Sequence, residues 1–175
     1  VSDEIGEALM RSVIRNTLQA VLNPEDYTAR SNLMWTSTLS ENRLIKLGKK
    51  GDFGCHLIEH QLGAYTDCNH GQGMAVLLPV YYGHIYKDGL KKFARFAANV
   101  WHIPQEGKSE EELAEEGIQM LTDFIHEIGL PATLRELGVR DRSVLKKIAV
   151  SSHYSMGGYR KLNPEEIMEI LTECF

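Results

Sequence analysis

The chain has 175 residues, of which 43% are hydrophobic and 25% charged, and its formal net charge is -5 at pH 7. This length fits one domain with a substantial core, while the acidic balance argues against a nucleic-acid partner. No apolar run approaches the roughly 18 residues that a membrane span needs. Three cysteines, an odd number in a chain of this size, favour a reducing compartment. We therefore expect a cytoplasmic protein that acts on small molecules.

Two helices are predicted before the glycine-rich loop at residues 48–53. Apolar residues recur at helical spacing as far as Val21, and Ser2 is placed to cap this first helix. Asn23 as a cap, with Pro24 at the first helical position, predicts the start of a second helix. The first residues carry neither an initiator Met nor a signal pattern. We expect the chain to begin inside a larger protein.

The second half of the chain shows the same helical signals. The acidic stretch 109–116 starts a helix that Gly129 ends, and its glutamates are expected to face solvent. A proline after a capping position recurs at 130–131 and at 163–164, where it predicts a helix start. The residues expected to face inward from the last helix are Ile167, Ile170 and Leu171. Since no segment alternates apolar and polar residues as a half-buried strand would, we predict an all-α helical bundle of one domain, residues 1–175.

Two histidines four positions apart, His56 and His60, are the first candidates for a functional site. On a helix this spacing places both imidazoles on one face, with Cβ atoms about 5 to 6 Å apart, close enough to serve one metal ion or one cavity. His70 follows a turn at residues 67–69 and heads an apolar run, which allows two helix ends to converge. Imidazole suits iron, zinc, copper and nickel alike, so the ligands do not name the metal. Ordinary helix histidines remain the alternative.

Two other patterns lie in this region. His56 to His60 match the H-x-x-E-H signature of inverted zinc peptidases, with Glu59 as general base. Against a peptidase, Glu59 would have to share the metal-facing side, the chain offers no strands, and His70 would have no role. Gly71 and Gly73 lack the preceding strand and third glycine of a dinucleotide-binding loop. These glycines are expected to relieve crowding where backbone approaches His70.

A long stretch around the histidines carries a family resemblance. Its motifs are Gly51-Asp52-Phe53, His56-Leu57-Ile58-Glu59-His60, Leu62-Gly63-Ala64, Asp67, His70-Gly71 and Ala75-Val76-Leu77-Leu78-Pro79. This stretch resembles the iron-containing alcohol dehydrogenase family. The outer segments 93–101 and 162–167 are similar to the butanol dehydrogenase branch and are less diagnostic. The resemblance spans nearly the whole chain and implies the helical, metal-binding C-terminal domain of such an enzyme.

The resemblance implies a role for each of the three histidines. His56 and His70 would bind the metal, and His60 would face the substrate and nicotinamide as a proton relay or as support for the ligands. The family's other two ligands, an Asp and a His on one helix turn, are expected upstream, because residues 3–8 contain no histidine four positions after an acid. Iron(II) is expected, with zinc as a replacement, and the metal would polarise the substrate oxygen.

The activity that the resemblance implies is hydride transfer between the carbinol carbon of a primary alcohol and nicotinamide, with aldehyde reduction as the reverse. NADH or NADPH would bind to an N-terminal Rossmann-like domain that the sequence lacks, so this fragment alone is expected to be inactive. We expect an alcohol or aldehyde as the small-molecule partner, a homodimer, and neither nucleic acid nor a membrane as a partner. A non-catalytic helical binding or assembly module is the alternative function.

Overall fold

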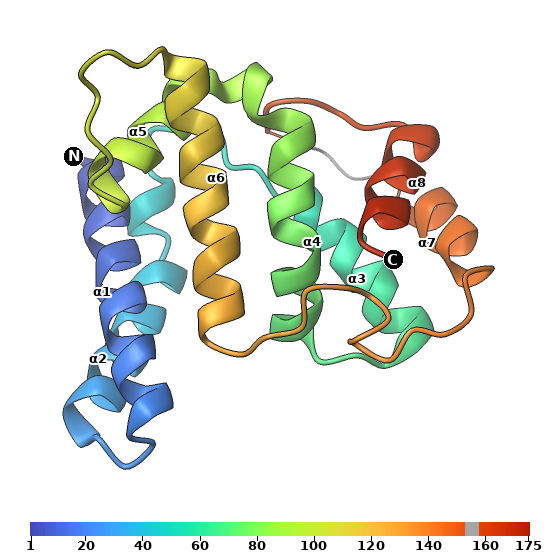
Figure 1. The fold of residues 1–175 in the computed structure, drawn as a ribbon, viewed down its shortest axis with the longest axis horizontal. Helices are drawn as coiled ribbons and strands as arrows, with labels where there is room; N and C mark the ends of the chain where they lie inside the picture. Colours follow the sequence, from blue (N-terminus) through green and yellow to red (C-terminus); the bar gives the residue numbers. More distant parts are fainter. Residues whose placement is uncertain (153–157) are drawn as a thin grey trace. The chain divides into compact units, whose positions relative to one another are not determined.

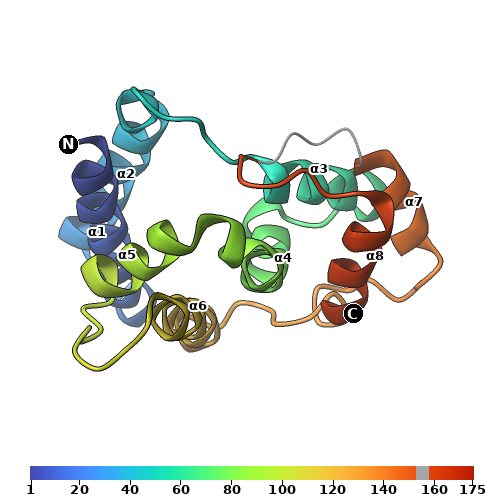
Figure 2. The ribbon, with the colours of Figure 1, turned by 90° about the horizontal axis from the view of Figure 1, so that it is seen from above.

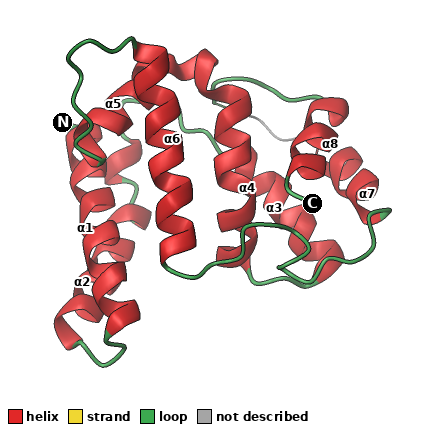
Figure 3. Cartoon of the chain, viewed as in Figure 1, coloured by secondary structure: helices red, strands yellow, loops and turns green. Residues whose placement is uncertain are grey.

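The structure is a computed structural model that describes residues 1–152 and 158–175. Within these ranges the regular secondary structure is entirely helical and no strand is present (Figure 3). The predicted all-α fold is therefore confirmed. No described helix combines the length and the apolar composition that crossing a membrane requires. The chain divides into two compact units, and each of them is assembled from two separate stretches of sequence.

The first unit comprises Val1–Gly51 and Lys91–Met120. Its first stretch forms a pair of helices, α1 (Ser2–Leu22) and α2 (Tyr27–Glu41), which lie side by side (Figure 1). A short 3-10 helix, η1 (Leu44–Lys46), follows α2 and packs against both helices of the pair. The amphipathic periodicity up to Val21 therefore predicts α1 correctly, although Val1 rather than Ser2 occupies its N-cap position.

The start of α2 lies further along the chain than the sequence indicated. Asn23 and Pro24 belong to a turn, in which the carbonyl of Asn23 accepts a hydrogen bond from the backbone N–H of Asp26 at 3.0 Å. Asp26 is the cap, because its side chain accepts from the N–H of Ala29 at 2.9 Å. Asp and Asn are about equally good caps, so neighbouring candidates compete and the helix start can shift between them.

The first unit is completed by α5 (Leu90–Val100), which begins one residue before its second stretch, and by the first part of α6 (Glu110–Glu127). The sequence predicted α6, and Gly129 ends it with a φ of +76°, a left-handed conformation that favours glycine. The sequence did not single out α5 as a helix. Close packing between the two helices depends on Gly117, because a Cβ there would lie 2.8 Å from the Cβ of Ala97.

Polar contacts join α1 to α5 inside the first unit. Glu7 is buried on α1, where it pairs with Arg95 and accepts a hydrogen bond from the Asn99 side chain at 3.1 Å. One turn away, Asp3 pairs with Lys92. Charged hydrogen bonds of this kind compensate for removing the Glu7 carboxylate from water.

The second unit comprises Asp52–Leu90 and Leu121–Phe175. Its helices are α3 (Gly54–Thr66), α4 (His70–Ile85), the 3-10 helix η2 (Tyr86–Gly89), α7 (Val144–Ser152) and α8 (Pro164–Glu173). α3 packs against α4 and α7, and α8 packs against α4 and α7, as the view from above shows (Figure 2). The four helices therefore enclose one core.

The two predicted proline-marked helix starts behave differently. At 163–164 the prediction is confirmed, because the Asn163 side chain accepts from the N–H of Glu166 at 2.8 Å and caps α8. The three residues expected to face inward from this helix are fully buried. At 130–131 the prediction is wrong, since turns follow and the next helix begins only at Val144. The physical difference is that Leu130 has no side-chain oxygen with which to cap a helix.

Candidate metal centre

A tight turn brings α3 and α4 together as a helical hairpin. Asp67 ends α3 in the left-handed conformation, with a φ of +54°, and its N–H donates to the carbonyl of Gly63 at 2.8 Å. Asn69 then caps α4 by accepting from the N–H of Gln72 at 3.2 Å. The turn predicted at residues 67–69 is confirmed, and it makes His70 the first residue of α4.

The buried side of α3 determines where its histidines point. Cys55, Ile58 and Leu62 recur at helical spacing and are all buried in the core of the second unit. This packing leaves His60 exposed and His56 half-buried on other parts of the helix surface. His56 and His60 therefore lie at the edge of the core rather than inside it.

The structure brings the three predicted histidines together. The ring centroid of His70 lies 5.6 Å from that of His56 and 5.7 Å from that of His60. The rings of His56 and His60 are 6.3 Å apart, and Phe53 stacks on His56 at 4.6 Å. His84, on the same helix as His70, instead contacts Glu173 at 2.9 Å. Of the four histidines on α3 and α4, the three of the hairpin converge and His84 does not.

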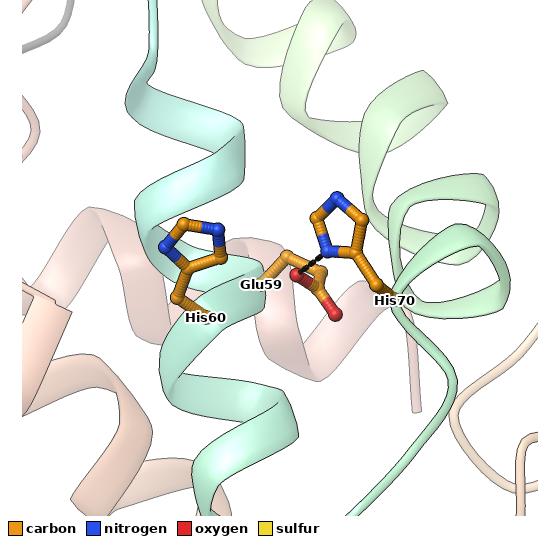
Figure 4. Close-up of side chains that lie close together, drawn as sticks. All are labelled: Glu59, His60 and His70. Carbon is orange, nitrogen blue, oxygen red and sulfur yellow. Dashed lines mark hydrogen bonds and ion pairs between the residues drawn. The ribbon is translucent and has the colours of Figure 1, made fainter.

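Glu59 is part of this cluster, although the sequence did not predict its place there. It is only 2% exposed, and its Oε2 contacts Nδ1 of His70 (Figure 4). A signal was present in the sequence, because a carboxylate on the apolar face between Ile58 and Leu62 needs a polar partner. Its burial against His70 also argues against the peptidase alternative, in which Glu59 would have to reach a water molecule as general base.

Gly73 provides the space for the Glu59 carboxylate. A Cβ at Gly73 would lie 2.8 Å from Oε1 of Glu59, a separation that side chains do not tolerate without moving. A Cβ at Gly71 would lie 3.4 Å from Asn69, which is an ordinary contact. The expectation that glycine relieves crowding near His70 is therefore confirmed for Gly73, and the crowding atoms belong to Glu59.

The donor atoms at this site fit a divalent transition metal. One ligand atom each from Glu59, His60 and His70 lies within 4.8 Å of the other two, and the ring of His56 borders the group. Imidazole nitrogen and carboxylate oxygen are ligands that iron and zinc both accept. Both His60 and His70 are exposed, so the cluster is accessible to further ligands and to a substrate.

Known proteins are similar in sequence to this chain along most of its length. The chain is 37% identical to NADH-dependent butanol dehydrogenase A of Clostridium acetobutylicum, with 100% of this chain and 46% of that protein covered. It is 30% identical to the NADPH-dependent aldehyde reductase YqhD of Escherichia coli, with 85% of this chain and 38% of that protein covered. The chain thus spans less than half the length of these curated relatives.

The solved structures agree with the sequences. The crystal structure of NADH-dependent butanol dehydrogenase A from Thermotoga maritima superposes with a TM-score of 0.91 at 30% identity, over 99% of this chain and 46% of that one. The model of the Fe-containing alcohol dehydrogenase family, C-terminal, matches residues 1–175. On this match over its whole length, the chain belongs to the Fe-containing alcohol dehydrogenase family.

Proposed function

We propose that this chain is the metal-binding part of an NAD(P)-dependent alcohol dehydrogenase that interconverts primary alcohols and aldehydes. The observation that carries the proposal is the convergence of three histidines from α3 and α4 in a chain that matches the family throughout. Relatives named as butanol dehydrogenases and as an aldehyde reductase support this substrate class. Both NADH-dependent and NADPH-dependent proteins are among them.

His56 and His70 are the proposed metal ligands, with iron(II) or zinc as the metal. Stacking on Phe53 at 4.6 Å and half-burial restrict the orientation of the His56 ring, as a ligand requires. Contact with Glu59 restricts the His70 ring in the same way. Two restricted rings with centroids 5.6 Å apart are suited to share one ion.

His60 is the proposed proton-relay residue. It is exposed, and its ring lies 5.7 Å from that of His70, so it borders the site where substrate oxygen would be placed. When bound, the metal would polarise the oxygen of the alcohol or aldehyde. His60 would then accept a proton during alcohol oxidation and return it during aldehyde reduction. The relatives are more than twice as long as this chain, and we propose that residues outside it bind the nicotinamide cofactor.

The test replaces each histidine by Ala in the full-length protein and measures metal content together with butanol oxidation. His56→Ala and His70→Ala are expected to lose bound metal and turnover. His60→Ala is expected to keep its metal while the turnover rate falls by about 10²- to 10⁴-fold, as for loss of a general acid–base. His84→Ala is the matched control, because His84 also lies on α4 but contacts Glu173. Unchanged metal content in both His56→Ala and His70→Ala would exclude the assignment.

A further inference from the structure

Glu59 is a carboxylate on the buried face of a helix. Its 2% exposure is comparable to that of Ile58 beside it, so the Glu59 side chain has been taken out of water. An ionised carboxylate in such a place is strongly destabilising unless a hydrogen-bond donor compensates for the lost solvation. Nδ1 of His70, which contacts its Oε2, supplies that donor when Nδ1 carries the proton.

The surrounding backbone holds the carboxylate in this position. Gly73 on α4 faces the Glu59 side chain, and a Cβ there would meet Oε1 at 2.8 Å and Cγ at 3.0 Å. On α3 itself, a Cβ at Gly63 would lie 3.7 Å from the same Oε1. The hairpin therefore forms a close-fitting slot for Glu59, which aims one carboxylate oxygen at His70.

His70 needs an orienting contact of this kind. Its side chain is 56% exposed at the first position of α4, so packing alone leaves the ring free to turn. A neutral imidazole carries one N–H, and a hydrogen bond at one ring nitrogen determines which nitrogen remains available as an acceptor or ligand. If Nδ1–H donates to Glu59, the lone pair is at Nε2, on the far side of the ring from the carboxylate.

We propose that Glu59 is a positioning residue that holds His70 in the Nδ1–H tautomer and so presents Nε2 to the metal. This inference rests on the proposed function, because it assigns His70 as a ligand. Although a Glu59 oxygen lies within 4.8 Å of donor atoms of His60 and His70, in this scheme Glu59 contacts the His70 ring and not the metal or the substrate. It acts through the ring of His70, and Gly73 is required because it leaves room for the carboxylate.

The first test measures metal affinity in the full-length protein by competition with a chelator. Glu59→Leu keeps the approximate size of the side chain but removes the acceptor, and affinity is expected to fall about 10- to 100-fold, as for other carboxylate partners of metal-bound histidines. Glu59→Gln keeps an acceptor oxygen and is expected to restore most of the affinity. Equal metal affinities for wild type and Glu59→Leu, with metal present in both, would overturn the positioning role of Glu59 but leave the proposed function standing.

A second pair of variants tests the positioning role of Glu59 without changing Glu59 itself. Gly73→Ala is expected to displace the carboxylate and weaken metal binding, because its new Cβ would overlap Oε1. Gly71→Ala is the matched control on the same helical turn, since its Cβ would make an ordinary contact. Equal losses in the two variants would count against the proposal, because they would indicate a general effect on α4.

A spectroscopic measurement separates positioning from a merely structural role. In ¹⁵N-histidine NMR of the metal-free full-length protein, the His70 signals, identified by their loss in His70→Gln, are expected to show a protonated Nδ1 and an unprotonated Nε2. In Glu59→Leu the Nε2–H tautomer is expected to gain population. An unchanged tautomer would overturn the inference, whatever the stability of the variant. Absence of metal from the wild-type protein would instead overturn the proposed function and this inference with it.

Discussion

Cys55 and Cys174 are buried thiols in the core of the second unit. Burial raises the pKa of both groups, to about 12 for Cys174, so neither forms the reactive thiolate near neutral pH. Cys68 differs because it lies, partly exposed, in the turn between α3 and α4. Cys68 is therefore expected to be more reactive than the two buried thiols, although all three lie in one unit.

Alkylation with iodoacetamide at neutral pH is expected to modify Cys68 first. Cys55 and Cys174 are expected to react only once the protein is unfolded, because the thiolate and not the thiol is the nucleophile. Peptide mapping by mass spectrometry before and after adding denaturant measures the order of labelling. Modification of Cys55 in the folded protein at the rate of Cys68 would contradict this expectation.

Glu7 makes the stability of the first unit dependent on pH. Burial by itself raises the pKa of Glu7, but hydrogen bonds from Arg95 and Asn99 outweigh it and bring the pKa below the ordinary value of 4.5. A carboxyl with a lowered pKa binds fewer protons in the folded state than in the unfolded state. Its stabilising contribution is therefore complete above about pH 4.5 and is lost as the pH falls through the folded pKa.

Comparison of wild type with Glu7→Gln tests this dependence. The free energy of unfolding of wild type is expected to exceed that of the variant at neutral pH, and the difference is expected to shrink as the pH falls below 4.5 and through the lowered pKa of Glu7 in the folded protein. Urea denaturation at several pH values provides the measurement. A difference that stays constant over this range would show that the Glu7 charge does not stabilise the folded chain.

At the scale of single helices, the sequence predicted a helix start correctly where a capping side chain and its partner are close in sequence. The cap of α8 is an example, because Asn163 and Glu166 each bond the other's backbone, at 2.8 and 2.9 Å. Both the start and the buried face of this helix were predicted from ten residues of sequence. The start of α2 was not, because Asn23 and Asp26 are both good caps and the turn between them decides which one is used.

Asn163→Ala is expected to lower the free energy of unfolding by about 1 kcal/mol, the usual cost of losing an N-cap. The reason is that the N–H of Glu166 loses its acceptor at the first turn of α8. Asn163→Asp is the matched control, since it keeps an acceptor oxygen and is expected to stay near wild type. Equal destabilisation of both variants, measured by chemical denaturation, would show that the side-chain cap is not what stabilises this helix start.

At the scale of the whole molecule, neither compact unit is a continuous piece of the chain. The chain passes from one unit to the other after Gly51, Leu90 and Met120, and the last two passages fall within α5 and α6. The core of the second unit, for example, draws helices from both of its stretches. We propose that residues 1–175 behave as a single domain, because neither unit can be made from one stretch of sequence alone.

A single cooperative unfolding transition is the expected consequence. Both tryptophans of the chain, Trp35 and Trp101, belong to the first unit, whereas far-UV circular dichroism reports on the helices of both units. The denaturant midpoints from tryptophan fluorescence and from circular dichroism are expected to coincide, as they do in two-state unfolding. Two separate midpoints would show that the units unfold independently and would contradict the single-domain proposal.

The sequence by itself determined the all-helical class, the turn at residues 67–69 and the pairing of His56 with His60, because each depends on residues a few positions apart. Helical spacing alone places His56 and His60 near each other. Only the tertiary structure showed that Glu59, eleven positions before His70, lies buried against that ring in the space left by Gly73. The physical reason is that a contact between two helices depends on the rotation of each helix about its own axis, which its buried side chains set. A local sequence pattern does not show how the rotations of two helices combine.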